Sequence, residues 1–235
     1  MGVPTKITSY KLTLKTKRKL EQYATNLKTS KAKIINYALF EIFVKYIGKI
    51  DAAAVATYIK DTSLNLKPDS YTFHLSVDYY ERIIQLKKEV QAINYSEYHD
   101  NEFIGILLSF YFDKVAIFRK KKVNEYLIKD QQPSQIGLYL NKKLKDKINS
   151  ICNRYQLNAG VIIFDILTDI YLGKLPFGHF PKDVVIDSEE KDRIIIFLPP
   201  TLHQQLKNLP LSNSFVTEIR AEQYLKKFNL STIKG

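Results

Sequence analysis

The sequence predicts a mainly helical protein with short antiparallel β-ribbons, because one strand–helix–helix pattern recurs along the chain. Runs of alternating polar and apolar residues, typical of strands, appear four times. Each run is followed by apolar residues at helical spacing, then by a turn and a second apolar helix. A lone short strand leaves backbone N–H and C=O groups without partners, so each strand needs another strand to pair with.

In the first repeat, Tyr10, Leu12 and Leu14 form the inward face of the strand, and two helices follow it. In the second repeat, Tyr71, Phe73 and Leu75 alternate in the same way. The helical positions that we expect to be buried are Leu20, Tyr23, Ala24 and Leu27 in the first repeat, and Tyr80, Ile83 and Ile84 in the second.

The third and fourth repeats agree with each other most closely. Leu140 and Leu198 end their strands, and apolar residues follow at offsets of +4, +8 and +11 in both. The inward strand residues are Ile136, Leu138 and Leu140, and Ile194, Ile196 and Leu198. Agreement in both strand and helix favours a true repeat.

The turns between helices support this division. Ser30, Asn158 and Ser212 each precede a β-branched apolar residue by four positions, where a side-chain oxygen caps a helix start. In the second repeat Asp100 is the expected cap. Pro199 and Pro200 lie at a strand-to-helix transition, where proline is tolerated. The expected organisation is unit 1 at 1–48, a linker with a short helix at 49–69, unit 2 at 70–118, a basic linker at 119–134, unit 3 at 135–173, a linker at 174–191, and unit 4 at 192–229.

The composition favours an acidic partner. The chain has 235 residues, and its 36 Lys and Arg against 24 Asp and Glu give a net charge of +12. Such an excess is typical of proteins that bind nucleic acid or an anionic membrane surface. Cys152 is the single cysteine, which excludes an internal disulfide and suggests a buried thiol. No signal peptide or membrane-spanning run is apparent, so we expect no membrane association and a cytoplasmic, nucleoid-associated protein.

A short strand followed by two helices, the second opening at a Ser-Lys or Ser-Asn cap, resembles the ribbon-helix-helix superfamily of DNA-binding proteins, of the Arc, MetJ and CopG type. The stretches "YKLTL" and "LKTSKAKIINYAL" match this pattern most closely. The resemblance implies that two units fold together, and that their paired strands enter the major groove of double-stranded DNA. It also implies four such units in two intrachain pseudo-dimers. The simplest arrangement pairs unit 1 with unit 2 and unit 3 with unit 4, but the linkers also allow other pairings.

Alternation identifies the side chains that would read bases. With Tyr10, Leu12 and Leu14 inward, Ser9, Lys11 and Thr13 face outward, and Ser70, Thr72 and His74 do so in unit 2. The alternative is that they are solvated positions of an edge strand. The outward residues of units 3 and 4 are Gln135, Gly137, Tyr139, Arg193, Ile195 and Phe197. Because this second set is partly apolar, we expect that ribbon to be covered by protein or to serve self-association, with Gln135, Tyr139 and Arg193 as secondary contacts.

The family resemblance also implies phosphate anchors at the start of each second helix, where free N–H groups favour anions. Ser30, Lys31 and Lys33 occupy this position in unit 1, and Lys15 and Lys17 begin the preceding helix. Asp100 would repel a phosphate in unit 2. The run Arg119 to Lys122 would contact the DNA backbone or form a solvated helix end.

No catalytic motif is apparent, and the four histidines lack metal-ligand spacing. We therefore expect no enzyme activity and no cofactor. The leading hypothesis is a sequence-specific DNA-binding regulator or a plasmid or mobile-element DNA-site protein. The alternatives are a protein-interaction adaptor that kept the fold, and an architectural protein that binds DNA without sequence preference.

Overall fold

A computed structural model describes residues 4–46, 50–115, 126, 131–169, 190–228 and 230. These residues are mainly helical and contain two antiparallel sheets of two strands each. Within these ranges, no helix is long and apolar enough to cross a membrane. The run Arg119 to Lys122 and most of the expected linker 174–191 lie outside the described residues.

A strand followed by two helices occurs four times, and we number these segments 1 to 4 in chain order. Segment 1 is β1 (Thr5–Lys11), α1 (Leu14–Asn26) and α2 (Lys31–Phe40), which continues as the π-helix η1 (Glu41–Lys45). Segment 2 is β2 (Ser70–Ser76), α4 (Val77–Asn94), α5 (Asp100–Phe110) and the π-helix η2 (Tyr111–Val115). Segment 3 is β3 (Ser134–Asn141), α7 (Lys142–Tyr155) and α8 (Ala159–Thr168). Segment 4 is β4 (Lys191–Leu198), α9 (Pro200–Lys207) and α10 (Asn213–Lys227). The helix α3 (Ala52–Asp61) lies between segments 1 and 2, where the sequence predicts a short helix.

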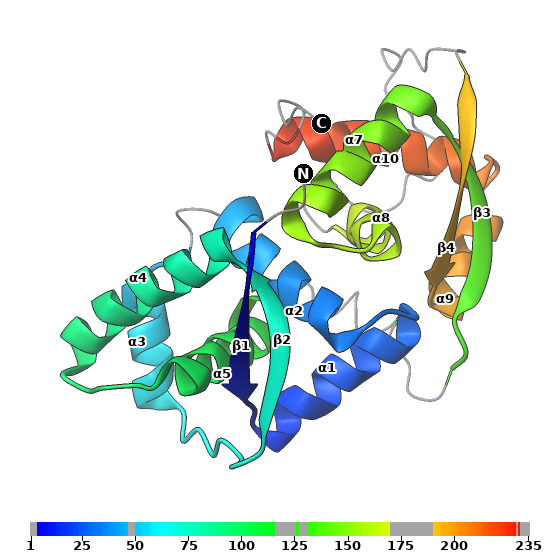
Figure 1. Ribbon diagram of the computed structural model, residues 1–235. Helices are drawn as coiled ribbons and strands as arrows, with labels where there is room; N and C mark the ends of the chain where they lie inside the picture. The colour runs from blue at the N-terminus through cyan, green and yellow to red at the C-terminus, as the bar shows by residue number, and fades with distance from the viewer. Residues whose placement is uncertain are drawn as a thin grey trace. The chain divides into compact units, whose positions relative to one another are not determined.

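Each sheet joins two consecutive segments. β1 pairs with β2 and β3 pairs with β4, both antiparallel. In Figure 1 the strands β1 and β2 lie side by side, and α5 packs against β1. The described residues fall into two compact units, one within 1–21 and 30–118 and the other within 22–29 and 119–235. The sequence alone does not decide which strands pair. In the structure, the strand of segment 1 pairs with that of segment 2, and the strand of segment 3 pairs with that of segment 4.

One expectation about segment 1 was wrong by two residues. The alternating pattern predicts Leu14 as the last inward strand residue, but Leu14 begins α1 and is 48% exposed, whereas Leu12 is buried. The strand ends early because Thr13 caps the helix: its Oγ1 accepts a hydrogen bond from the Thr16 N–H at 3.1 Å. The residues at the helix start in the other segments are Ser76, Asn141 and Pro199.

With Leu12 as the reference, all four segments share one pattern. Leu12, Leu75, Leu140 and Leu198 are buried and are separated by 63, 65 and 58 residues (75 − 12, 140 − 75 and 198 − 140). The offsets +4, +8 and +11 from each leucine are buried in every segment. They are Thr16, Leu20 and Tyr23; Tyr79, Ile83 and Leu86; Leu144, Ile148 and Ile151; and Leu202, Leu206 and Leu209. Tyr80 and Ile84, which were expected in the core, are only half-buried.

Both ribbons have an internal two-fold relation between their strands. The same offset of 63 makes Ser9 equivalent to Thr72, and these two residues are directly paired. The offset of 58 makes Gly137 equivalent to Ile195, and these are also paired. Each ribbon therefore has its two-fold centre at two equivalent residues, each three positions before the buried reference leucine of its segment.

The second helices begin as expected in three segments. Side chains of Ser30, Asn158 and Ser212 accept hydrogen bonds from backbone N–H groups at the helix starts, which confirms the three caps. In segment 2 the cap is His99 and not Asp100, which is the first helical residue. The reason is that the Glu102 side chain accepts a hydrogen bond from the His99 N–H at 3.3 Å, which fixes the turn one residue earlier. The expectation that Cys152 is buried is confirmed.

Candidate nucleic-acid interface

The outer face of the β1–β2 ribbon is a strip of six side chains in three opposed pairs. Ile7 lies opposite His74, Ser9 opposite Thr72, and Lys11 opposite Ser70. Ser70, Thr72 and His74 are exposed, whereas Ser9 and Lys11 are half-buried. The opposite face holds Tyr10, Tyr71 and Phe73, whose rings contact one another. Alternation thus separates a polar outer face from an aromatic inner face.

Of the six predicted base-reading residues, five lie on this outer face and one does not. Thr13 lies beyond β1 as the cap of α1, and its place on the strip is taken by Ile7, which is 67% exposed. The sequence contained a signal for this shift, because the buried offsets +4, +8 and +11 start from Leu12. This signal is difficult to recognise because the +4 position holds Thr16, and a polar residue there interrupts the apolar pattern.

Lys11 is held at the edge of the strip by α5. Its Nζ donates to Glu102 Oε1 at 3.0 Å, and this hydrogen bond lowers the pKa of the Glu102 carboxyl. The approach of α5 to β1 depends on Gly105, where an added Cβ would lie 1.7 Å from the Lys11 carbonyl oxygen. Glycine is therefore required for this close approach between helix and strand.

The N-terminus of α2 presents Ser30 with two lysines. Ser30 Oγ accepts from the Lys33 N–H at 3.3 Å, and Lys31 Nζ is paired with Glu21 at 2.8 Å on the exposed surface. Among the described residues, Lys33 has no ion-pair partner. An exposed pair such as Lys31–Glu21 contributes little to stability, so an incoming phosphate competes with it at small cost.

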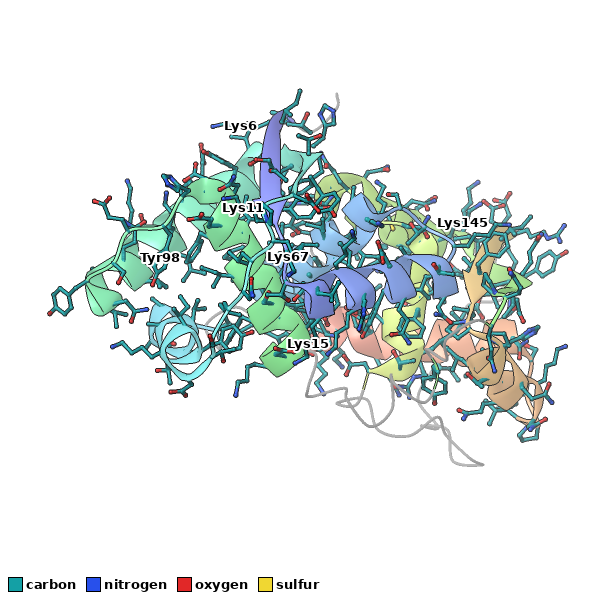
Figure 2. All side chains as sticks on the ribbon, turned by 90° about the horizontal axis from the view of Figure 1, so that it is seen from below. Lys6, Lys11, Lys15, Lys67, Tyr98 and Lys145 are labelled. Atoms are coloured by element: carbon teal, nitrogen blue, oxygen red, sulfur yellow. The ribbon has the colours of Figure 1, made fainter. Side chains whose placement is uncertain are left out.

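The N-terminus of α5 forms one wall of an open pocket of about 660 Å³ beside β1. Its cationic side chains are Lys6, Lys11 and Lys87, and Tyr98 and His99 also line it. Figure 2 shows Lys6 and Lys11 along β1, with Lys15 and Lys67 beyond the end of the strand. Lys6 was not among the predicted site residues, because it precedes the alternating run; its Nζ lies 3.7 Å from the centroid of the Tyr80 ring.

Asp100 is not a free negative charge in this pocket. It accepts hydrogen bonds from Lys87 and, at 2.7 Å, from the Tyr80 hydroxyl. Partial burial acts to raise the pKa of the Asp100 carboxyl, but these hydrogen bonds outweigh it and the pKa is lowered. With Lys6, Lys11 and Lys87 against Asp100 and the neighbouring Glu102, the formal charge here is +1 (3 − 2). The repulsion expected from Asp100 is therefore offset by lysines.

The lysines at the start of α1 have partners in the first unit. Lys15 Nζ lies 2.7 Å from Asp113, although its side chain is 64% exposed. Lys17 forms a hydrogen bond with Tyr71, which raises the pKa of its ammonium group. Both ammonium groups extend from the helix that directly follows β1.

The outer face of the β3–β4 ribbon is different in chemistry. Tyr139 and Ile195 are each about half exposed, at 52% and 51%. Arg193 lies over Gly137, where an added Cβ would be 3.1 Å from its Nε. Gln135 is exposed and Phe197 is half-buried. Phe197 is partly covered, because Lys28 Nζ lies 4.3 Å from the centroid of its ring, whereas Tyr139 and Ile195 stay about half exposed.

Lysines at one end of this second ribbon are neutralised by carboxylates. The pairs are Lys142 with Glu190 at 3.0 Å, Lys145 with Asp192 at 3.1 Å, and Lys191 with Glu218 at 3.3 Å. The described residues contain no group of three or more His, Cys, Asp or Glu side chains placed to hold a metal ion. Comparisons with protein-family models, with curated proteins and with solved structures found no match to this chain.

Proposed function

We propose that the protein binds double-stranded DNA with sequence preference by inserting the β1–β2 ribbon into the major groove. One observation carries this proposal: five of the six side chains on the outer face of the ribbon are Ser, Thr, His or Lys, with the exposed Ile7 at one end, above an aromatic core. The major groove admits a two-stranded ribbon, and its base edges offer hydrogen-bond donors and acceptors to such side chains.

The surroundings of the strip are suited to phosphates. The N-terminus of α5 lies beside β1 with Lys6 and Lys87, and α2, which begins at Ser30 and Lys31, contacts β2. Helix N-termini and lysines favour anions, and phosphate contacts fix the orientation of a protein on the duplex. In this proposal the ribbon reads bases while α2 and α5 position it.

The ribbon-helix-helix assignment belongs to the same proposal. Four segments of one strand and two helices would form two pseudo-dimers, segments 1 with 2 and 3 with 4. The support is the register, since both ribbons are centred on equivalent residues, Ser9 with Thr72 and Gly137 with Ile195. This is the symmetry expected when two copies of one unit pair through their strands.

A titration of the full chain against a labelled random duplex, followed by fluorescence anisotropy at several salt concentrations, tests DNA binding. We expect measurable affinity at low salt and a linear fall of log K with log salt, as phosphate contacts release counterions. No affinity for any duplex at low salt would contradict the proposal and support a role without DNA.

A second candidate, a protein-interaction adaptor that self-associates, is favoured by the β3–β4 ribbon. Its exposed Tyr139 and Ile195, beside lysines that are already paired, fit an apolar protein surface better than a DNA backbone. Sedimentation of the wild-type chain and of Ile195→Lys separates the candidates. Concentration-dependent association that the substitution abolishes supports the adaptor role for this ribbon. Equal sedimentation of both chains as a single species opposes it.

A further inference from the structure

Each pair of segments contains a buried hydrogen bond between a tyrosine and a carboxyl group. In the first unit, the Tyr111 hydroxyl donates to Glu41 Oε2 at 2.5 Å. In the second, the Tyr224 hydroxyl donates to Asp165 Oδ2 at 2.5 Å. All four side chains are almost fully buried. The Tyr111–Glu41 bond joins η2 to η1, the π-helical continuations of the two second helices. The Tyr224–Asp165 bond joins α10 to α8, the second helices of segments 4 and 3.

The tyrosine occupies the same position in segments 2 and 4. Tyr111 and Tyr224 both lie 12 residues after the cap of their helix, His99 and Ser212 (111 − 99 and 224 − 212). At this sequence position segments 1 and 3 have isoleucine, Ile42 and Ile170. The tyrosine is thus a feature of even-numbered segments only.

The carboxyl group that accepts the tyrosine hydroxyl lies in the odd-numbered segment of each unit. Glu41 lies 11 residues after Ser30, and Asp165 lies seven residues after Asn158. The equivalent positions in the even-numbered partners hold apolar side chains, Phe110 and Ile219. Donor and acceptor are therefore divided between the two kinds of segment in both units.

We propose that this tyrosine–carboxyl hydrogen bond suppresses pairing between like segments of two chains, beyond the preference that the linker already gives. When an odd segment pairs with an even one, the buried carboxyl group receives the tyrosine hydroxyl. If segment 1 paired with segment 1 of a second chain, each Glu41 would keep the ion pair of its Oε1 with Lys45 of the same helix, at 3.3 Å, but both Oε2 atoms would face isoleucine at the tyrosine position. A buried polar group that loses its hydrogen bond is costly, so homotypic pairing is disfavoured. The bond acts in this way whatever the outer face of the ribbon binds.

A cysteine at the centre of the ribbon reports homotypic pairing. Ser9 lies opposite its equivalent Thr72 in the chain, so in a homotypic pair of segments 1 it would lie opposite Ser9 of the second chain. In the variant Ser9→Cys, oxidation then links two chains only when segments 1 have paired with each other. Cys152 is buried and serves as the background in the chain without the reporter.

The test compares Ser9→Cys chains with and without Tyr111→Phe, refolded at about 0.1 mM and oxidised. The linker gives intrachain partners an effective concentration of order millimolar, so pairing without preference would place roughly one chain in ten in homotypic pairs. We expect almost no disulfide-linked dimer for Ser9→Cys alone and a rise to about that fraction with Tyr111→Phe. Phenylalanine preserves the packing, and it removes the tyrosine hydroxyl, so equal numbers of Glu41 carboxyl groups lack that hydrogen bond in both arrangements.

Tyr58→Phe is the matched control, because the buried Tyr58 also donates to a carboxylate, Asp113 at 3.1 Å, but lies on α3. It should leave the dimer fraction unchanged. Equal dimer fractions with Tyr111→Phe and Tyr58→Phe, or linked dimers already in Ser9→Cys alone, would overturn the proposal. If Tyr111→Phe does not refold by circular dichroism, the second unit gives the same test with Ile195→Cys and Tyr224→Phe.

Discussion

At the scale of single residues, the outer strip of β1 and β2 carries the proposed base contacts. Thr72 is exposed at the centre of the ribbon, opposite Ser9. Removing its hydroxyl without changing its shape should weaken binding to a preferred site and leave binding to random duplex almost unchanged. We expect Thr72→Val to cost about 1 kcal/mol of discrimination, roughly fivefold, at the lower end for a base contact.

The measurement is the ratio of affinities for a selected and a random duplex at one salt concentration. Thr57→Val, an exposed threonine on α3 away from the ribbon, is the control and should leave the ratio unchanged. An unchanged ratio in Thr72→Val would remove Thr72 from the base-reading set.

Gly105 is a second residue with a defined role, because it allows α5 to approach β1 closely. A methyl group there would overlap the Lys11 carbonyl oxygen, so α5 must move away from β1. We expect Gly105→Ala to lower the free energy of unfolding by about 3 kcal/mol, at the upper end for overpacking, because backbone atoms form the obstacle. Denaturant unfolding measures this. Gly137→Ala is the control, since its added methyl group would meet only the Arg193 side chain, which can move.

Three first helices end with a residue in the left-handed region. Lys28, Tyr95 and Gln156, with φ of 44°, 51° and 54°, hold this position in segments 1, 2 and 3. Glycine adopts this conformation without strain, so Gln156→Gly should raise the stability by about 0.5–1 kcal/mol. Thermal unfolding of Gln156→Gly and Gln156→Ala checks this, because alanine keeps the strain. A lower melting temperature for the glycine variant than for the alanine variant would contradict the assignment.

At the scale of elements, much of the fold could be predicted because each strand and helix has its own pattern of buried residues. The caps at Ser30, Asn158 and Ser212 followed from side-chain chemistry. The first strand was misread because Leu14 continues the alternation beyond the point where Thr13 starts a helix. A local cap decided the boundary, and hydrophobic alternation alone does not contain that information.

The contacts between elements could not be predicted in this way. The Lys11–Glu102 pair joins residues 91 positions apart, and the Tyr111–Glu41 bond joins residues 70 apart. Both contacts depend on how α5 and its π-helical continuation pack against other elements. The local pattern of polar and apolar residues does not reveal this packing. The pocket that contains Lys6 also forms only when β1 meets the start of α5.

The N-terminus of α2 carries a prediction at this scale. Lys31→Ala should weaken binding to specific and random duplex by the same factor and reduce the salt slope by about one, because a phosphate contact is lost. Lys60→Ala, an exposed lysine on α3, removes the same charge outside the strip and the pocket beside it and is the control. If both variants reduce the slope of log K against log salt equally, the effect comes from net charge alone, and the N-terminus of α2 does not contact a phosphate.

At the scale of the whole molecule, the chain contains two ribbons of one geometry and different chemistry. The first presents hydroxyl, imidazole and ammonium groups with the exposed Ile7 at one end, and the second presents Tyr139, Arg193 and Ile195 among paired lysines. Both are centred on equivalent residues, and in each unit a tyrosine–carboxyl bond joins the second helices of the two segments. We therefore propose DNA reading by the first ribbon and an apolar contact surface at the second.

Selection of bound sequences from a random DNA pool, with the full-length chain, tests the central claim most directly. We expect one short motif with approximate two-fold symmetry, because Ser9 and Thr72 are equivalent and paired at the centre of the reading strip. The symmetry should be imperfect, since the equivalent pairs Lys11 with His74 and Ile7 with Ser70 differ in chemistry. Binding to all sequences without enrichment, or no recovery of DNA at low salt, would contradict base reading by the β1–β2 ribbon.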